Sequence, residues 1–241
     1  MLSLKAVAVR SILYLAPPVW VYVGYRQPGT IDKLAFLIDQ TGRWALTFLL
    51  LATAMSSVRG LACRACRAMN IGWGKRLSDW NILIRERRAL GLYSFLLACA
   101  HVGAYYWLEQ GGEWAWFIED IRERPFIAVG VVGFALLIPL AVTSFNRAMR
   151  LMGRRWKQLH RSVYLIGLLA LVHLSLLKKA TELDHWPFIV VFVLIVVTRV
   201  LTRRRGSYRH DDGEETSRGS RESKPLTESA EQSVKHTAFA R

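Results

Sequence analysis

Cysteines, acidic residues and enzyme-type motifs are all scarce in this sequence of 241 residues. Three cysteines are too few for a disulfide scaffold. Charged residues make up 21% of the chain, against about 25% in an average soluble domain. The chain has no Ser–His–Asp arrangement and no Walker loop, and Gly72-Trp73-Gly74 lacks the third glycine of a dinucleotide-binding motif. The sequence therefore gives no sign of a disulfide-rich domain, a hydrolase triad or a nucleotide-binding loop.

Apolar residues, by contrast, are abundant and concentrated in blocks. They make up 52% of the chain, which excludes a disordered protein, and six stretches stand out: 6–25, 42–58, 89–108, 126–145, 162–177 and 187–201. A spanning helix needs about 20 residues. The second, fifth and sixth stretches are shorter than this, and flanking Arg and Lys side chains, whose long stems reach the headgroups, extend them to the length of a span. The sequence predicts an all-α integral membrane protein, a six-transmembrane-helix bundle within residues 1–203.

The first stretch contains Pro17-Pro18, which predicts a kink. Read alone, this stretch also suits a signal peptide, but no small-residue cleavage site follows it, so we expect a retained helix. At the other end, residues 204–241 have no apolar periodicity and are expected to form a disordered cytoplasmic tail. A tail of about 40 residues is too short for a flavin or nicotinamide domain of 100 residues or more.

The net charge of +15 is distributed as a topology signal. Segment 59–88 holds eight Lys and Arg against two acids, and 147–161 holds six against none. Segment 109–125 holds two Arg against five acids. The positive-inside rule therefore places both termini in the cytoplasm and 109–125 outside, in the periplasm of a bacterium. The positive charge is then explained by topology and by membrane lipids, and we expect no nucleic-acid partner.

His101 and His173 are the strongest candidate site residues, because ionisable side chains inside apolar spans are costly and usually functional. Each lies twelve residues past the cytoplasmic entry of its helix, about 18 Å deep, and the two helices are expected to be parallel. Two neutral imidazoles at one depth suit the axial ligation of a b-type heme. The alternative is a pair of histidines that bond to neighbouring helices or to each other.

His160 lies thirteen residues before His173, roughly 20 Å nearer the cytoplasm. Its role is either that of a second iron ligand or that of an interfacial residue. In a straight helix, thirteen residues turn its side chain by about 220° away from His173, and a bend near Gly167 would restore the alignment. Arg87 and Arg88 occupy the facing positions and are candidates for a heme propionate or a flavin phosphate. Arg43 is expected to open the second helix, where it either meets a propionate or extends to the headgroups.

Several strings resemble the MsrQ family, the heme-binding membrane subunits of bacterial periplasmic methionine-sulfoxide reductase systems. These are Thr41-Gly42-Arg43, Arg87-Arg88-Ala89-Leu90-Gly91-Leu92 running to His101, Arg124-Pro125, and Trp156 to His160 with Val163-Tyr164-Leu165 and His173. The resemblance covers roughly residues 5–203 and lies within the ferric-reductase-like transmembrane superfamily. Arg87 and Arg88 stand where other members of that superfamily carry a further histidine, which argues against a second bis-histidine heme.

The resemblance implies a ferric-reductase-like cytochrome b in the inner membrane, with heme b, FMN, and roles for His101, His160 and His173. Its donor would be a cytoplasmic flavin reductase or a quinol. Its acceptor would be a periplasmic molybdenum-containing catalytic subunit that reduces methionine sulfoxide in oxidised proteins. On this reading the chain carries electrons and does no substrate chemistry itself. The alternatives are a stand-alone transmembrane ferric or quinone reductase and a non-redox transporter whose histidines relay protons.

Overall fold

The computed structural model describes residues 4–27, 32–74, 76–177 and 185–201, and the regular structure within these ranges is helical throughout. The chain divides into two compact units, Met1–Val196 and Val197–Arg241. Of the second unit only residues 197–201 are described. The expected disordered tail, 204–241, lies outside the described residues.

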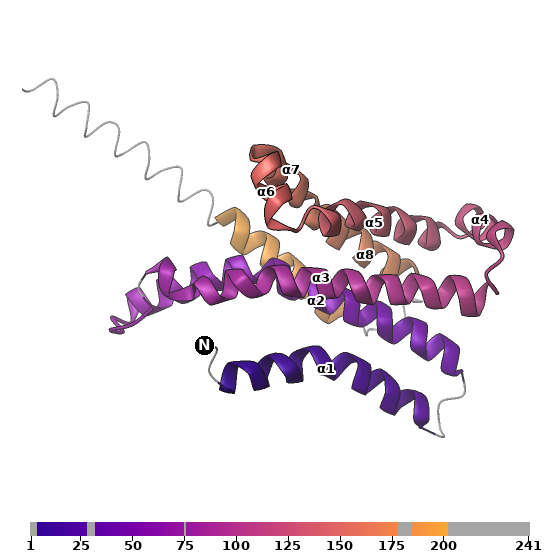
Figure 1. Ribbon diagram of the computed structural model, residues 1–241, viewed down its shortest axis with the longest axis horizontal. Helices are drawn as coiled ribbons and strands as arrows, with labels where there is room; N and C mark the ends of the chain where they lie inside the picture. Colours follow the sequence, from indigo (N-terminus) through magenta and orange to yellow (C-terminus); the bar gives the residue numbers. More distant parts are fainter. Residues whose placement is uncertain (1–3, 28–31, 75, 178–184, 202–241) are drawn as a thin grey trace, which may run out of the picture. The chain divides into compact units, whose positions relative to one another are not determined.

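The α-helices are labelled in Figure 1: α1 (Leu4–Arg26), α2 (Lys33–Ala68), α3 (Asn81–Ala104), α4 (Trp114–Glu123), α5 (Pro125–Val142), α6 (Asn146–Met152), α7 (Arg154–Leu159) and α8 (Val163–Leu177). Two short 3₁₀ segments, η1 (Leu77–Trp80) and η3 (His160–Ser162), precede α3 and α8. A π-helical turn, η2 (Tyr105–Glu109), ends α3. An apolar helix, Trp186–Leu201, follows α8.

Four helical segments of the described chain are long and apolar enough to cross a membrane: Lys33–Ala68, Ser78–Glu109, Pro125–Val142 and Arg154–Leu177. They contain the second, third, fourth and fifth apolar stretches of the sequence, apart from a few residues at the end of the fourth. The first stretch forms α1 and the sixth forms the shorter helix Trp186–Leu201. The all-α membrane fold is thus confirmed, whereas the count of six spanning helices stays a prediction.

The predicted boundaries of the second span were wrong. The prediction was 42–58, but α2 has 36 residues, about 54 Å at 1.5 Å per residue, and the hydrocarbon core is only about 30 Å thick. Its start is set by Asp32, whose carboxylate accepts hydrogen bonds from the backbone N–H groups of Leu34 and Ala35. Its last ten residues were expected in a loop. An apolar run marks only the part of a helix inside lipid, and Ala and Arg continue the helix beyond it.

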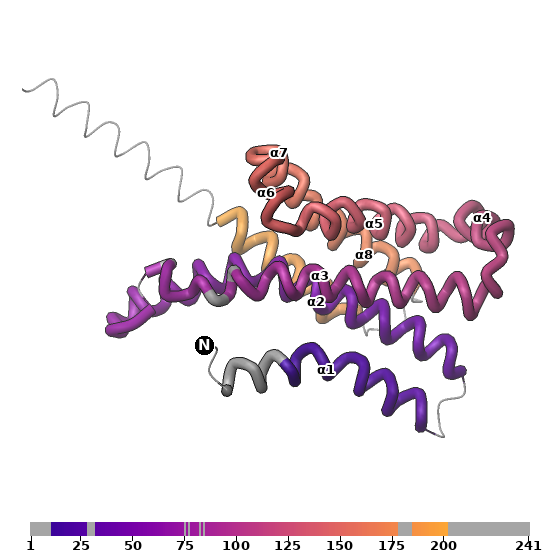
Figure 2. The backbone as a smooth tube through the Cα atoms, in the orientation of Figure 1, coloured from indigo at the N-terminus to yellow at the C-terminus, as the bar shows by residue number. Residues whose placement is uncertain are grey.

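Within the first unit, α3 and α8 run in one direction and α2 and α5 in the other, as Figure 2 shows. The α2–α3 and α5–α8 pairs have the most extensive packing. Leucines of α2 link the two pairs: Leu46 and Leu50 pack with Leu171 and Leu174 of α8, and Leu49 packs with Leu137 of α5. This arrangement brings the two parallel helices that carry His101 and His173 into one core.

Candidate functional site

The structure brings His101 of α3 and His173 of α8 together. Their ring centres are 6.2 Å apart and their planes are inclined by 83°. The expectation that both rings occupy one level on parallel helices agrees with this geometry. Their role as ligands is a separate matter and stays a prediction.

Each of these imidazoles is held by a backbone carbonyl from another helix. Nδ1 of His101 lies 2.8 Å from the carbonyl oxygen of Ile38 on α2. Nδ1 of His173 lies 2.6 Å from the carbonyl oxygen of Phe126 on α5. Since a carbonyl oxygen only accepts, Nδ1 must be the protonated nitrogen in both rings. The lone pair of each neutral imidazole is then on Nε2, the arrangement expected of a histidine that binds a metal.

The spacing of the pair fits a metal cofactor held between the two rings. An imidazole–metal bond is about 2 Å long, and each ring centre lies about 1 Å beyond its nitrogen, so coaxial ligands have ring centres about 6 Å apart. Each ring can rotate about its own metal–nitrogen bond, so perpendicular planes are compatible with such a pair. Two neutral nitrogen donors are also the axial set of an electron-transfer heme.

A pocket of about 380 Å³ adjoins the residues next to both histidines. Its lining is mostly apolar: Cys99, Val102 and Gly103 of α3, Tyr106 of η2, Trp114 and Phe117 of α4, and Val131 and Phe134 of α5. Val102 follows His101 in the chain, and Val131 follows the glycine that faces His173. Neither histidine is among the lining residues, so the pocket is an apolar hollow formed by neighbouring positions of the same helices.

His160 lies apart from this pair, in the 3₁₀ turn η3 between α7 and α8. Its ring stacks on Trp156 with 3.9 Å between ring centres, and its Nδ1 donates to the Trp156 carbonyl over 3.1 Å. Its Nε2 is buried and has no hydrogen-bond partner among the described residues. A buried nitrogen with a free lone pair is compatible with a ligand role. The sequence leaves open a straight helix and a helix bent near Gly167; in the structure the departure from α-helical geometry lies at His160 itself, in the 3₁₀ turn.

The three arginines singled out in the sequence occupy different environments. Arg43 forms an ion pair with Asp39, with 2.8 Å between Nε and Oδ2. It was expected to open its helix, but α2 begins ten residues earlier, at Lys33. Arg87 is half-buried and donates to Ser56 Oγ over 3.3 Å, whereas Arg88 is exposed. Their roles in binding a propionate or a phosphate stay predictions.

Small residues flank the histidines in the sequence, and Gly103 and Gly167 are among those that could let a macrocycle approach the backbone closely, which stays a prediction. A Cβ added at Gly103 would meet no atom within 4 Å, and one added at Gly167 would meet Phe192 at 2.9 Å. Gly167 thus serves helix–helix packing. The carbonyls of Ile38 and Phe126 were missed, since every residue has a carbonyl and nothing in the sequence marks these two.

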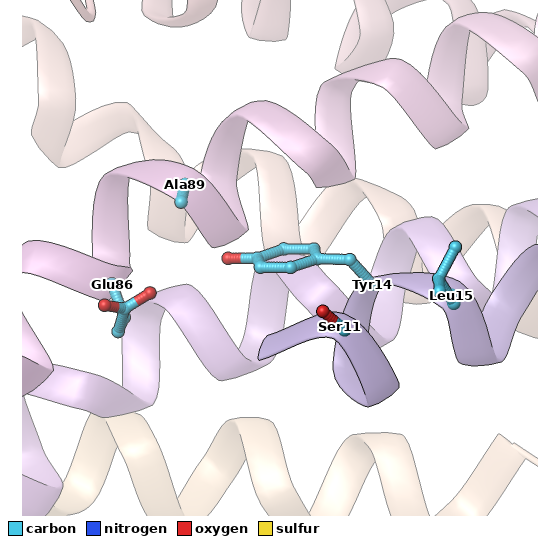
Figure 3. Close-up of a pocket in the computed structure, with 5 residues that line it drawn as sticks. All are labelled: Ser11, Tyr14, Leu15, Glu86 and Ala89. Atoms are coloured by element: carbon cyan, nitrogen blue, oxygen red, sulfur yellow. The ribbon is translucent and has the colours of Figure 1, made fainter. Parts of the chain in front are cut away.

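A second pocket, of about 480 Å³, lies between α1 and α3 (Figure 3). Ser11, Tyr14 and Leu15 line it from α1, and Glu86 and Ala89 line it from α3. In Figure 3 the Tyr14 ring extends from α1 toward Glu86 and Ala89. The lining combines an apolar surface with a carboxylate, a phenol and a hydroxyl.

These features define a class of protein: a helical membrane protein with paired intramembrane histidines. A family model described as the ferric reductase like transmembrane component matches residues 41–171 of the chain. That range includes α3, His101 and His160, and it ends two residues before His173.

Relatives with high coverage narrow the class. The chain is 37% identical over 221 residues to the protein-methionine-sulfoxide reductase heme-binding subunit MsrQ of Xanthomonas campestris pv. campestris (strain B100), covering 86% of this chain and 94% of that protein. It is 37% identical over 173 residues to MsrQ of Herminiimonas arsenicoxydans, covering 71% of each. For MsrQ of Bordetella pertussis the identity is 34% over 194 residues, covering 79% and 86%. The chain belongs to the MsrQ family of ferric-reductase-like, multi-pass membrane proteins.

Proposed function

We propose that this chain is a membrane electron-transfer subunit that binds a b-type heme between His101 and His173. The observation that carries the proposal is the pair itself: ring centres 6.2 Å apart, with each Nδ1 donating to a backbone carbonyl. Membership of a family whose relatives are named heme-binding subunits, and of the ferric-reductase-like class, supports an electron-transfer role.

The protein's contribution is to hold and orient the ligands. The carbonyls of Ile38 and Phe126 fix the tautomer and orientation of both imidazoles, with Nδ1 protonated and the lone pair of Nε2 available to iron. The heme, when bound, supplies a centre that accepts and passes on one electron at a time.

For the electron path we propose entry from the cytoplasmic side of the bacterial inner membrane and exit to the periplasm, with both termini cytoplasmic. The acceptor is a periplasmic molybdenum-containing catalytic subunit that reduces methionine sulfoxide in oxidised proteins. The donor is a cytoplasmic flavin reductase or a quinol. The pocket lined by Tyr14 and Glu86 supports the quinol, because it offers an apolar surface for the ring and polar groups for its hydroxyls. Heme reduction in vesicles supplied with each donor separately distinguishes the two.

FMN belongs to the proposal as well, at the inner end of α3. Arg87 is half-buried there and carries donors suited to a phosphate. The exposed Arg88 is the adjacent candidate, and His160 offers a buried Nε2. Arg43, which is paired with Asp39, is the candidate for binding a heme propionate. It lies one residue after Gly42, the glycine that faces His101. A stand-alone ferric or quinone reductase uses the same ligands, and it differs from this proposal in lacking a dedicated periplasmic partner.

The proposal is tested by the absorption spectrum of the purified protein and of its His101→Ala and His173→Ala variants. The wild type should show the bands of a reduced low-spin b-type heme. Each substitution removes one axial ligand, so heme should be lost or converted to a form with an open coordination position. Replacement of His185 by Ala is the control and should leave the spectrum unchanged. An unaltered low-spin spectrum in both ligand variants would refute the pairing, and a proton-relaying transporter predicts no heme bands at all.

A further inference from the structure

Two glycines lie against the two facing imidazoles, one on each partner helix. A Cβ added at Gly42 of α2 would lie 3.0 Å from both Nδ1 and Cε1 of His101. A Cβ added at Gly130 of α5 would lie 2.8 Å from Nδ1 and 2.9 Å from Cε1 of His173. In both cases the imidazole edge that carries the donor nitrogen contacts the helix where the side chain is missing.

The same spacing connects each glycine to the carbonyl that its histidine uses. Gly42 is four residues after Ile38, and Gly130 is four residues after Phe126. In an α-helix the Cα–Cβ bond tilts toward the N-terminus, so a side chain covers the turn that precedes its own Cα. A Cβ at position i+4 therefore stands beside the carbonyl of residue i. Glycine at i+4 leaves that carbonyl open to a ring from another helix.

Backbone conformation does not explain these two glycines. Neither has a positive φ, and both lie inside helices where alanine is more favourable by about 0.5–1 kcal/mol. The other glycines of these two helices are not crowded: a Cβ on Gly60 of α2 would come no closer than 3.8 Å to its nearest neighbour, and one on Gly133 of α5 no closer than 3.6 Å. The missing side chains at Gly42 and Gly130 matter because they leave room for the imidazole rings of His101 and His173.

Resting on the proposed function, we propose that Gly42 and Gly130 are positioning residues. Each glycine lets one axial histidine donate Nδ1–H to a helix carbonyl. That hydrogen bond sets the orientation of the ring and the donor strength of its Nε2. An imidazole bound to iron through Nε2 cannot swing away from an added methyl group. The methyl must lengthen the Nδ1–carbonyl bond or tilt the ring. A weaker bond at Nδ1 makes Nε2 less basic, which favours the reduced iron. Gly130 has the closer contact and should be the more sensitive position.

The test is the set Gly42→Ala, Gly130→Ala, Gly60→Ala and Gly133→Ala, each purified from membranes as the full chain. Gly60→Ala and Gly133→Ala add the same methyl group to α2 and α5 away from the histidines, and they should keep wild-type heme. The two positioning variants should bind heme about 10- to 100-fold more weakly, the cost typical of losing a ligand's supporting hydrogen bond. Their low-spin paramagnetic resonance signal should change, and their midpoint potential should rise. Circular dichroism and gel filtration report whether each variant is folded.

A double-mutant cycle shows whether Gly130 acts through His173. In a His173→Ala background the added Gly130→Ala should change neither heme content nor spectrum, because the ring that it displaces is gone. Wild-type heme affinity, spectrum and potential in both positioning variants would overturn the inference while leaving the heme proposal intact. Equal losses in the matched controls would overturn it too. A wild-type protein without heme would instead refute the proposed function.

Discussion

At the scale of single residues, His101, His173 and His160 differ in the group that accepts the hydrogen bond from Nδ1. In His101 and His173 this nitrogen donates to a carbonyl from another helix, so the ring is oriented by tertiary structure. In His160 it donates to the carbonyl of Trp156, four residues earlier in the chain. The His160 ring is therefore placed by its own local turn and by stacking on Trp156, whose Nε1 donates to the Thr143 carbonyl over 2.9 Å.

This difference leads to a prediction for His160→Ala. The substitution removes the inner imidazole and leaves the His101–His173 pair untouched. Reduction of heme from the cytoplasmic side should slow, while the spectrum of the heme proposed at His101 and His173 stays largely intact, and stopped-flow absorption measures the rate. Gln158→Ala, at an exposed position two residues away, is the control. Unchanged donor-to-heme rates in His160→Ala would assign His160 to an interfacial, structural role.

At the scale of elements, the end of α3 is joined to α4 by a buried carboxylate. Asp120 of α4 accepts hydrogen bonds from the Tyr105 hydroxyl and the Gln110 amide, and its other oxygen lies 3.2 Å from Arg124 Nε. Tyr105 is held there by the π-helical turn, a geometry common near functional sites. Asp120 is one of the five acids of segment 109–125, which the charge pattern places in an outer loop. It is only 8% exposed, so it belongs to the packing of this end.

We therefore predict that Asp120→Ala lowers stability and that Glu119→Ala does not. Removing the carboxylate leaves two half-buried donors without their partner, and the cost of an unsatisfied donor is about 1–3 kcal/mol when it is fully buried and less when solvent reaches it. The exposed Glu119 is the adjacent control, and its replacement should change the free energy of unfolding by less than about 0.5 kcal/mol. Thermal unfolding in detergent, followed by circular dichroism, measures both. Equal midpoints for the two variants would contradict a structural role for the Asp120 cluster.

At the scale of the whole molecule, the distribution of charge predicts the orientation in the membrane. The basic segments 59–88 and 147–161 lie at the opposite ends of their helices from the acidic segment 109–125. With Asp120 buried, the exposed acids of that segment are Glu109, Glu113, Glu119 and Glu123. A surface bearing these acids is suited to dock an electron acceptor that presents basic groups.

Cysteine labelling tests this orientation. Gly112 is unsuitable as the position of the introduced cysteine, because its φ is +78° and an added Cβ would meet Trp107 at 3.0 Å. Ala115, by contrast, is exposed on α4. An Ala115→Cys variant should react with a membrane-impermeant maleimide in intact cells. The parent protein is the control for its own cysteines, of which Cys63 and Cys66 are buried and Cys99 is half-buried. Reaction only after permeabilisation would reverse the topology and the proposed direction of electron flow.

The sequence by itself determined the class of this protein and its two central residues. The lengths of apolar runs and the sign of the charges between them are sums over neighbouring residues, so they need no tertiary information. The equal depth of His101 and His173 follows from the constant rise of a helix once both entry points are known. The helix ends could not be predicted as well, because α2 continues past the apolar run that marks it.

The tertiary structure alone decided what surrounds the imidazoles. The carbonyl that orients His101 is 63 residues away in the chain, and the one that orients His173 is 47 residues away. Gly42 and Gly130 gain their meaning from the same contacts, since nothing local distinguishes them from Gly60 or Gly133. Helix rise sets the depth of a side chain, but the rotation and packing of neighbouring helices decide which backbone atoms it meets. That choice depends on the whole core at once.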